Sequence, residues 1–305
     1  MESVDLTSFD TIQLLGSGSC GSVFLVEKHD DHCKYAMKVT KKDSKNALHN
    51  AIIEQDILVH LHHPFIITLH YSWQKDAQMY IVMPYCECGN FYNFMKRQKY
   101  QCFTEEQTKY YASCILLALE YLHSVGIVYI DLKPENILVC ASGRIMLSDF
   151  DLSVYNKDKI IRKTFKTSHD EIGVVVEPNV VLYGKAGTPE YIAPESIENK
   201  PYTCIVDWWS LGILIYEMLY GITPFYHKDI SEIYKLISKC HLTFPRYTPL
   251  HYKLSHPCKS LIKSLLKHDP NKRLGYNGAV EIKGHSFFED VEFQLLRNKI
   301  PPIIP

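Results

Sequence analysis

The sequence predicts an α+β fold, with a β-rich N-terminal part and a larger, mostly helical C-terminal part. Three β-type stretches and one main helical pattern lie in residues 1–84, whereas the longest helical patterns follow residue 85. A length of 305 residues is typical of about two domains, and 46% apolar residues can bury a substantial core. We therefore expect two domains, at 1–84 and 85–305, with a connector at 84–89.

The first β-type stretch, residues 9–26, is expected to form two strands joined by a glycine-rich turn. Gly16, Gly18 and Gly21 fit the pattern G-x-G-x-x-G-x-V, with Val23 at its last position. Glycine lets backbone N–H groups approach phosphate oxygens because no Cβ intervenes. Dinucleotide-binding folds share the pattern but place a helix after the third glycine, and here β-type residues follow. The stretch therefore favours a flap of two strands.

The next elements are a strand at 35–38, a helix at 47–61 and an apolar strand at 79–84. The strand at 35–38 ends in Lys38, and Glu54 lies on the helix, 16 positions later (54 − 38). A single lysine at a strand end is usually solvated, and a single helical glutamate usually lies on the surface. Their pairing therefore depends on the rest of the pattern.

Two helices are expected in the C-terminal domain. The residues from Thr104 to Gln107 form a capping box, which opens a helix that runs to about Ser124. The helix from Asp207 to Leu219 is apolar nearly all round, so we expect it to be buried.

The stretch from residue 129 to residue 150 contains two carboxylates, one cation and one amide: Asp131, Lys133, Asn136 and Asp149. Two short β-type runs between Asn136 and Asp149 predict a hairpin that brings these groups together. Oxygen ligands beside an ammonium group suit magnesium and a phosphate chain. The alternative is an ordinary hairpin with polar residues at its turns.

The order D-L-K-P-E-N, followed after a short hairpin by D-F, resembles the catalytic and metal-binding loops of protein kinases. The resemblance covers essentially the whole chain and implies the bilobal protein-kinase fold, with the connector at 84–89 as the hinge between the two lobes and with ATP and Mg²⁺ as cofactors. It implies that Asp131 is the catalytic base and that Lys133 neutralises the transferring phosphoryl group. Asn136 and Asp149 are implied as the metal ligands.

The resemblance also implies a nucleotide site, in which Lys38 holds phosphates and pairs with Glu54. Met83 is implied as the gatekeeper residue at the back of the adenine pocket, and the backbone of Pro84 and Cys86 is implied to bond the purine edge. Proline removes only a donor, and the adenine amino group needs a carbonyl. The full set of implied nucleotide-binding residues is Leu15, Gly16, Ser17, Gly18, Ser19, Cys20, Gly21, Ser22, Val23, Ala36, Lys38, Met83, Pro84, Cys86 and Leu138.

Residues 187–195, GTPEYIAPE, resemble the substrate-facing end of a kinase activation segment, which would span residues 149–195. Thr188 is implied to bond Asp131 and Lys133, as in serine/threonine kinases. Arg273 is implied to form a buried, structural ion pair with Glu195.

Further motifs resemble the AGC group of serine/threonine kinases, among them VDWWSLGILIYEM and HPFIITL. Asp151 follows the D-F pair, where most kinases carry glycine, and D-F-D-L-S is typical of the subgroup with plant phototropin-type and fungal flippase kinases. Because aspartate cannot adopt glycine-only backbone angles, we expect flipping of this loop to be restricted.

Four departures from the AGC pattern bear on regulation. Ile130 replaces the arginine before the catalytic aspartate, Gly184 replaces the phosphorylated threonine, and Asn90 replaces a carboxylate that helps to hold substrate arginine. The sequence ends at Pro305 without the hydrophobic C-terminal tail, which would leave a small-lobe hydrophobic pocket for a partner. These departures leave a nucleotide-binding pseudokinase scaffold as the alternative to an active kinase.

The expected substrates are proteins with basic residues upstream of the target. Glu135 and Glu217 match family positions that receive an arginine two residues before the target, and Lys185 predicts tolerance of polar or acidic residues just after it. The activation segment is long, with 46 positions between Asp149 and Glu195 (195 − 149). We expect its 151–183 part to be mobile and outside the core. Thr164, which follows Arg162 and Lys163, is a candidate autophosphorylation site, and a tolerated insertion is the commoner interpretation of this stretch.

Composition limits the other function classes. The net charge is −1, from 33 basic and 34 acidic residues, so the whole chain has no electrostatic attraction to nucleic acid or membranes. A basic stretch at 157–166 is the one feature that favours such a module, and a solvated loop is the commoner interpretation. The sequence shows no membrane span and no signal peptide, and its ten cysteines include no CxxC pair. We therefore expect free thiols and a location in the reducing cytoplasm or the nucleus.

Overall fold

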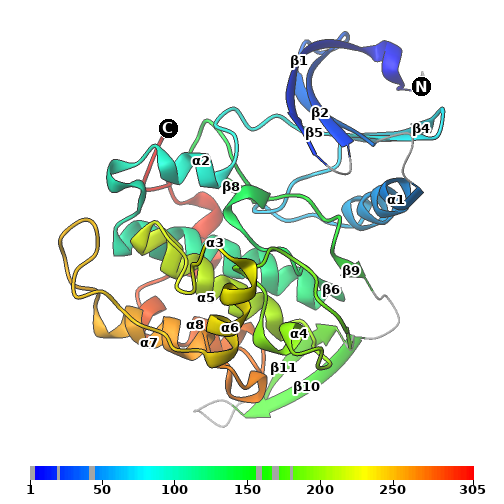
Figure 1. The fold of residues 1–305 in the computed structure, drawn as a ribbon. Coiled ribbons are helices and arrows are strands. Elements are labelled where there is room, and N and C mark those ends of the chain that lie inside the picture. The colour runs from blue at the N-terminus through cyan, green and yellow to red at the C-terminus, as the bar shows by residue number, and fades with distance from the viewer. Residues whose placement is uncertain (1–3, 19–20, 41–44, 156–159, 167–171, 179–180) are drawn as a thin grey trace.

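The computed structural model describes residues 4–305, except for 19–20, 41–44, 156–159, 167–171 and 179–180. The molecule has two lobes, as predicted (Figure 1): a small one built on a β-sheet and a larger one built on helices. Among the described helices, none combines the length and the apolar composition that a bilayer crossing requires.

The small lobe is an antiparallel sheet of five strands in the order β1-β2-β3-β5-β4, flanked by one helix. A short 3₁₀ helix, η1 (Leu6–Ser8), precedes the sheet. The main elements are β1 (Phe9–Ser17), β2 (Gly21–Lys28), β3 (Lys34–Thr40), α1 (Lys45–Val59), β4 (Tyr71–Lys75) and β5 (Gln78–Pro84). Each strand and the helix that the sequence predicted in this lobe is present.

The register of the sheet fixes where the glycine-rich turn lies. Lys38 pairs with Val23 on β2 and with Ile81 on β5, so the turn between β1 and β2 lies close to the end of β3. Gly21 begins β2, and a Cβ there would lie 2.2 Å from the Val39 carbonyl oxygen. Glycine at this position therefore permits close approach of the two backbones.

The large lobe contains seven helices and three two-stranded sheets among the described residues, with short 3₁₀ helices between them. The helices are α2 (Phe91–Lys96), α3 (Glu105–Ser124), α4 (Pro194–Ile197), α5 (Ile205–Tyr220), α6 (Ile230–Lys239), α7 (His256–Leu265) and α8 (Ala279–Lys283). The sheets pair β6 (Ile127–Val128) with β9 (Val154–Tyr155), β7 (Ile137–Val139) with β8 (Ile145–Leu147), and β10 (Ile160–Lys166) with β11 (Ile172–Pro178). The 3₁₀ helices are η2 (Lys99–Gln101), η3 (Pro134–Asn136), η4 (Pro270–Lys272), η5 (Ser286–Phe288) and η6 (Phe293–Asn298).

Helices α3 and α5 form the centre of the large lobe (Figure 1), and both were predicted from local patterns. Thr104 and Gln107 form the capping box: the Thr104 hydroxyl accepts the Gln107 N–H at 3.2 Å, and Gln107 Oε1 accepts the Thr104 N–H at 2.9 Å. All 16 residues of α5 are buried, which confirms the prediction from its apolar surface. The two helices give the site a rigid base.

The activation segment differs from expectation in one respect. The basic stretch at 157–166 was interpreted as a solvated loop, but residues 160–166 form strand β10, which pairs with β11 so that Thr164 lies opposite Val174. These strands form a two-stranded sheet of their own, and the sequence shows no clear alternation of apolar and polar residues that would have predicted it. The mobility of the segment and the modification of Thr164 stay predictions.

A buried ion pair joins the end of the activation segment to the rest of the lobe, as predicted. Arg273 donates to the two carboxylate oxygens of Glu195 at 2.7 and 2.8 Å. The remaining guanidinium donors bind the carbonyl oxygens of Ile205 and Lys267 at 3.1–3.2 Å. All five N–H groups of the guanidinium are therefore satisfied, which offsets the cost of burying the charge.

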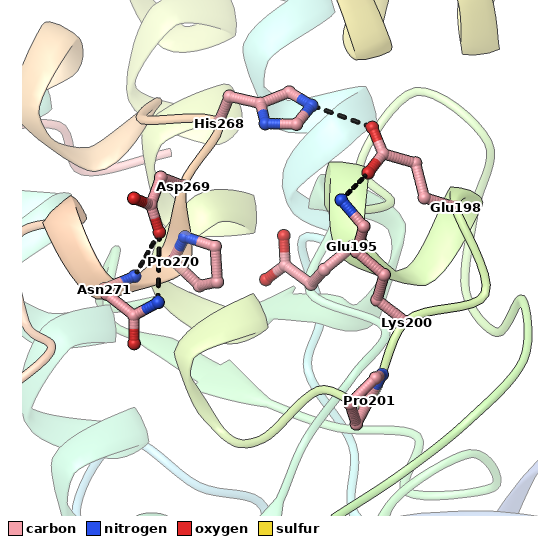
Figure 2. A pocket seen from close by; sticks show the side chains of 8 residues that line it. All are labelled: Glu195, Glu198, Lys200, Pro201, His268, Asp269, Pro270 and Asn271. Carbon is pink, nitrogen blue, oxygen red and sulfur yellow. Dashed lines mark hydrogen bonds and ion pairs between the residues drawn. The ribbon is translucent and has the colours of Figure 1, made fainter.

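A surface cavity of about 320 Å³ opens beside this pair (Figure 2). Its polar side chains bind one another: His268 Nε2 lies 2.8 Å and Lys200 Nζ 2.6 Å from the Glu198 carboxylate, and Asn271 binds Asp269. We assign no ligand to this cavity.

Replacing Arg273 with methionine should destabilise the fold, because Glu195 stays buried without its cation. The expected loss is about 3–5 kcal/mol in the free energy of unfolding, measured by chemical denaturation. Lys272→Met is the matched control, since Lys272 is the adjacent residue and its side chain is 78% exposed. We expect a change within ~0.5 kcal/mol for the control. A loss below ~1 kcal/mol for Arg273→Met would contradict the structural role.

Candidate active site

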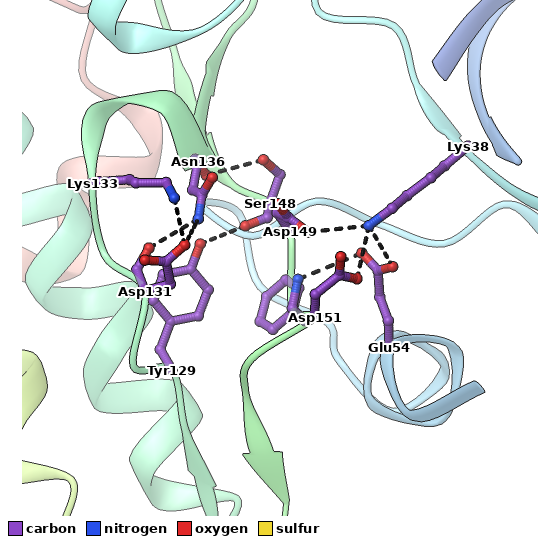
Figure 3. A network of polar contacts seen from close by, with 10 residues as sticks. Lys38, Glu54, Tyr129, Asp131, Lys133, Asn136, Ser148, Asp149 and Asp151 are labelled. Carbon is purple, nitrogen blue, oxygen red and sulfur yellow. Dashed lines mark hydrogen bonds and ion pairs between the residues drawn. The ribbon is translucent and has the colours of Figure 1, made fainter. Parts of the chain in front are cut away.

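The candidate site lies where the two lobes face each other, and Lys38 is at its centre (Figure 3). The Lys38 ammonium on β3 lies 2.7 Å from Glu54 on α1, as the sequence predicted. It also lies 3.1 Å from Asp149 and 2.9 Å from Asp151, both of which follow β8 in the large lobe. One cation from the small lobe therefore binds three carboxylates from two separate segments.

Burial shifts the pKa values of the charged groups in this cluster. The Lys38 side chain is 13% exposed and the Glu54 side chain 2%. Burial raises the pKa of Glu54 to about 7; Lys38 opposes this shift, while the negative charges of Asp151 and Asp149 add to it. Burial disfavours the charged form of Lys38, but the three carboxylates outweigh it, and the pKa of Lys38 lies well above its usual value.

Sequence reasoning missed the contact between Asp151 and Lys38. Asp151 was noticed only as a substitution that restricts backbone flipping, whereas its carboxylate lies within 4.8 Å of those of Glu54 and Asp149. The sequence did contain a hint of this contact, because Asp151 is only two residues from Asp149 and is expected near the groups that Asp149 contacts. Its direction could not be inferred from the spacing alone.

The second half of the site surrounds Asp131, which accepts four hydrogen bonds through its side chain. Lys133 Nζ donates to Oδ2 at 2.6 Å, and Asn136 Nδ2 donates to the same oxygen at 2.9 Å. Thr188 donates to Oδ1 through its N–H at 3.0 Å and through its hydroxyl at 2.9 Å. The Thr188 hydroxyl in turn accepts from Lys133 at 2.8 Å. The structure therefore brings together these four predicted residues.

Buried Asp207 holds the backbone in front of Asp131. Its carboxylate accepts the N–H groups of Tyr129 at 3.0 Å and Ile130 at 2.8 Å, and His123 Nε2 lies 2.7 Å from it. Ile130 has a φ of 73°, and the Asp131 N–H donates to the Tyr129 carbonyl at 2.9 Å, which closes a γ-turn. A left-handed conformation costs a β-branched residue about 1–3 kcal/mol, so strain is concentrated beside Asp131.

The residues predicted for adenine lie on strands that meet at the hinge. Ala36 on β3 pairs with Met83 on β5, and both are buried, as is Cys86 just beyond β5. Leu138, half-buried on β7, faces the start of α2 through a backbone bridge with Asn90. The structure thus gathers apolar surface from both lobes at the hinge.

The predicted phosphate flap is open. A Cβ added at Gly16 or Gly18 would meet nothing within 4 Å, and the hydroxyls of Ser17 and Ser22 lie 3.1 Å apart across the two strands. Leu15 is 39% exposed at the end of the flap. Ser19 and Cys20 lie outside the described residues.

A buried acid on α5 contacts the end of the activation segment. Glu217 is buried on α5 and accepts a hydrogen bond from the Tyr191 hydroxyl. Burial raises the pKa of Glu217 to about 7, the Tyr191 hydrogen bond opposes this, and Glu135 and Glu190 add to it by charge repulsion. Glu190, which accepts from Thr223, was not singled out in the sequence, although it lies inside the substrate-facing motif.

Comparison with known proteins gives a consistent result. The family model described as "Protein kinase domain" matches residues 9–288. Flippase kinase 1 of Saccharomyces cerevisiae is 43% identical over 98% of this chain and 34% of its own length. The serine/threonine-protein kinase nrc-2 of Neurospora crassa is 42% identical over 98% of this chain and 50% of its own, and phototropin-2 of Oryza sativa is 41% identical over 99% and 34%.

Two of these relatives are of the kinds that the D-F-D-L-S motif predicted, a fungal flippase kinase and a phototropin. The chain spans about one third to three fifths of the length of the first relatives that it matches.

Proposed function

Because the chain belongs to the protein kinase family, we propose that it is an ATP- and magnesium-dependent protein serine/threonine kinase of the AGC group. The observation that carries this proposal is the arrangement of Asp131, Lys133, Asn136 and Thr188 in one network, with Lys38 and Asp149 facing it. In this proposal residues 1–84 form the N-lobe, residues 85–305 form the C-lobe, and the hinge spans 84–89.

The nucleotide would lie between the lobes at the hinge. Ala36, Met83 and Leu138 offer apolar surface for adenine, and the carbonyl of Pro84 and the N–H of Cys86 offer its hydrogen bonds. The open flap above Lys38 leaves space for a phosphate chain, and its glycines let backbone N–H groups approach phosphate oxygens.

The donor set fits Mg²⁺. Asp149 supplies a carboxylate. Asn136 donates hydrogen bonds to Asp131 through Nδ2, which leaves the side-chain carbonyl oxygen of Asn136 for a metal. When bound, Mg²⁺ would neutralise negative charge on the phosphate oxygens. Lys38 would contribute a second positive charge to the phosphates, and Glu54 would hold it in position.

Asp131 would orient the substrate hydroxyl and accept its proton. The hydrogen bonds from Lys133 and Thr188 hold the carboxylate in one orientation, so that an oxygen lone pair can be directed at the hydroxyl. Lys133 would also place an ammonium group beside the phosphoryl group that is transferred, and so neutralise its negative charge.

Substrate selection would depend on acids near Asp131. Glu217 and Glu135 are proposed to bind an arginine two residues before the target. Asn90 should contribute less, because it lacks charge and its side-chain oxygen already accepts the Asn93 N–H at 2.9 Å, capping α2. Lys185 would make polar or acidic residues tolerable just after the target.

We propose that activity does not require phosphorylation of the activation segment. Gly184 cannot carry a phosphate, and Ile130 cannot bind one. The end of the segment is held by other contacts: Leu182 and Tyr202 exchange backbone hydrogen bonds at 2.8 and 3.0 Å, and Ser196 Oγ donates to the Gly184 carbonyl at 2.8 Å. Ile130 is 8% exposed and packs in the hydrophobic core in place of the usual arginine.

The first test is phosphoryl transfer from labelled ATP to a basic peptide. Lys38→Met should lower kcat by about 10²-fold or more, because a transition-state charge contact is lost, and Asp131→Asn should abolish transfer. Lys34→Met, on the same strand but exposed, is the matched control and should keep full activity. A Lys38→Met variant with more than about a tenth of wild-type kcat would contradict the assignment. A wild-type protein that binds ATP and transfers no label would favour the pseudokinase alternative.

The preference for upstream arginine should grow as pH rises. Glu217, with a pKa of about 7, is mostly neutral at pH 6 and mostly ionised at pH 8, and only the carboxylate attracts a guanidinium. The KM advantage of an arginine peptide over its alanine counterpart should therefore increase up to about tenfold across this range. Glu217→Gln should remove the pH dependence. A wild-type KM ratio that is constant between pH 6 and pH 8 would argue against Glu217 as the arginine site.

Phosphatase treatment of the purified protein should leave its activity within about twofold, since no phosphate is needed to order the segment. Mass spectrometry before and after treatment gives the phosphorylation state. A fall of tenfold or more that an upstream kinase restores, with modification near Tyr183, would show that a phosphate switch survives in altered form.

A further inference from the structure

Two cysteines from distant parts of the chain lie side by side at the hinge. The Sγ atoms of Cys86, just after β5, and Cys140, just after β7, are 3.7 Å apart. Cys86 is buried and Cys140 is half-buried, so the pair has one inner and one outer thiol. Neither thiol has a role in the proposed phosphoryl transfer.

The backbone around the pair holds both thiols in place. Both backbone polar groups of Val139 form hydrogen bonds with the hinge. Its carbonyl accepts the Cys88 N–H at 3.1 Å, and its N–H donates to the Gly89 carbonyl at 2.8 Å. Beyond β7, the Ala141 N–H donates to the Glu87 carboxylate at 3.1 Å. The hinge and the end of β7 therefore form one small hydrogen-bonded unit, and the two sulfurs face each other within it.

The pair is also chemically asymmetric. When the Cys86 thiol donates the hydrogen bond, that bond lowers the pKa of Cys140; burial and the negative charge of Glu87 oppose this effect, and the positive charge of Arg144 adds to it. The same hydrogen bond, with burial, raises the pKa of Cys86. The more accessible sulfur is thus the better nucleophile, and the buried one lies ready to react with it.

We propose that Cys86 and Cys140 are an oxidation site, which a peroxide converts into a reversible disulfide between the hinge and the end of β7. Forming the bond requires the sulfurs to approach by about 1.7 Å, from 3.7 Å to the ~2.05 Å of a disulfide. Nothing lies between them to be displaced, since they are already in hydrogen-bond contact.

The reaction has two steps. The Cys140 thiolate attacks a peroxide oxygen, the O–O bond breaks, and Cys140 becomes a sulfenic acid while hydroxide leaves and takes up a proton as water. Cys86 Sγ then attacks Cys140 Sγ: the S–S bond forms, the S–O bond breaks, and the Cys86 proton leaves with the hydroxyl group as a second water. The two thiols lose two electrons and hydrogen peroxide gains them. Two molecules of a small thiol such as glutathione reduce the Cys86–Cys140 disulfide back to two thiols and are themselves oxidised to glutathione disulfide.

The consequence for nucleotide binding rests on the proposed function, in which the Cys86 N–H bonds adenine. Drawing Cys86 Sγ toward Cys140 moves the residue that carries this donor. Because hydrogen bonds weaken steeply with poor distance and angle, the oxidised protein should bind ATP less tightly. The catalytic network around Asp131 lies on a different segment and should be unaffected.

The test treats the intact protein with hydrogen peroxide and maps its peptides under non-reducing conditions. Cys33, which is exposed, reports that the oxidant has acted. We expect a loss of two hydrogen masses, a peptide containing Cys140 linked to the hinge peptide, and recovery of both thiols with glutathione. The link should persist in Cys88→Ser, the matched variant from the same hinge segment, and should be absent in Cys140→Ser.

Kinetics complete the test. We expect the KM for ATP to rise at least fivefold in oxidised wild-type protein with kcat within about twofold, and no rise in Cys140→Ser treated in parallel. Modified Cys33 beside intact Cys86 and Cys140 thiols, a link through Cys88, or an unchanged KM in the linked protein would overturn the proposal. If even the reduced protein transfers no phosphate, the proposed function fails, and the linked peptide still decides the oxidation site.

Discussion

The geometry of the site depends on one buried carboxylate. Asp207 begins the fully buried helix α5 and accepts the N–H groups of both Tyr129 and Ile130. These two hydrogen bonds hold a γ-turn that an isoleucine would not adopt by itself. The turn directs Asp131 toward Lys133, Asn136 and Thr188. A strained backbone can persist only where its surroundings determine it, and here the rigid core supplies that constraint.

The charge distribution around Lys38 explains how the two lobes are coupled. Its ammonium binds one carboxylate from the small lobe and two from the large lobe, in an environment where Lys38 is mostly buried. Three negative charges near one positive charge leave the cluster short of positive charge. Such a site favours a further cation, which agrees with the proposed Mg²⁺, and Asp151 increases this demand. Burial raises the pKa of Glu54, and the negative charges of Asp151 and Asp149 add to this shift.

The end of the activation segment illustrates a change in the kind of interaction that holds a loop. The AGC pattern that the sequence resembles uses an arginine and a phosphate, whereas Ile130 and Gly184 leave neither. Hydrogen bonds from the Leu182 backbone and from Ser196, together with the burial of Ile130, hold the part of the segment around Gly184 without a phosphate–arginine pair. Loss of both charged partners leaves no buried charge to be compensated.

The sequence by itself determined the features that depend on short-range patterns. The capping box at Thr104, the β7–β8 hairpin and the apolar surface of α5 each follow from residues within a few positions of one another. The motif resemblance added the long-range partners of Asp131, Lys38 and Arg273, because these motifs have a known arrangement in space.

Tertiary structure alone decided contacts that no motif specifies. Asp151 and Lys38 are 113 positions apart, and Cys86 and Cys140 are 54 apart. Side-chain direction at such separations depends on how the lobes pack and on the exact register of neighbouring strands, and periodicity contains no information about either. The strained φ of Ile130 and the pairing of β10 with β11 could not be inferred from the sequence either. The first is imposed by Asp207 on helix α5, and the second lies in a stretch without clear periodicity.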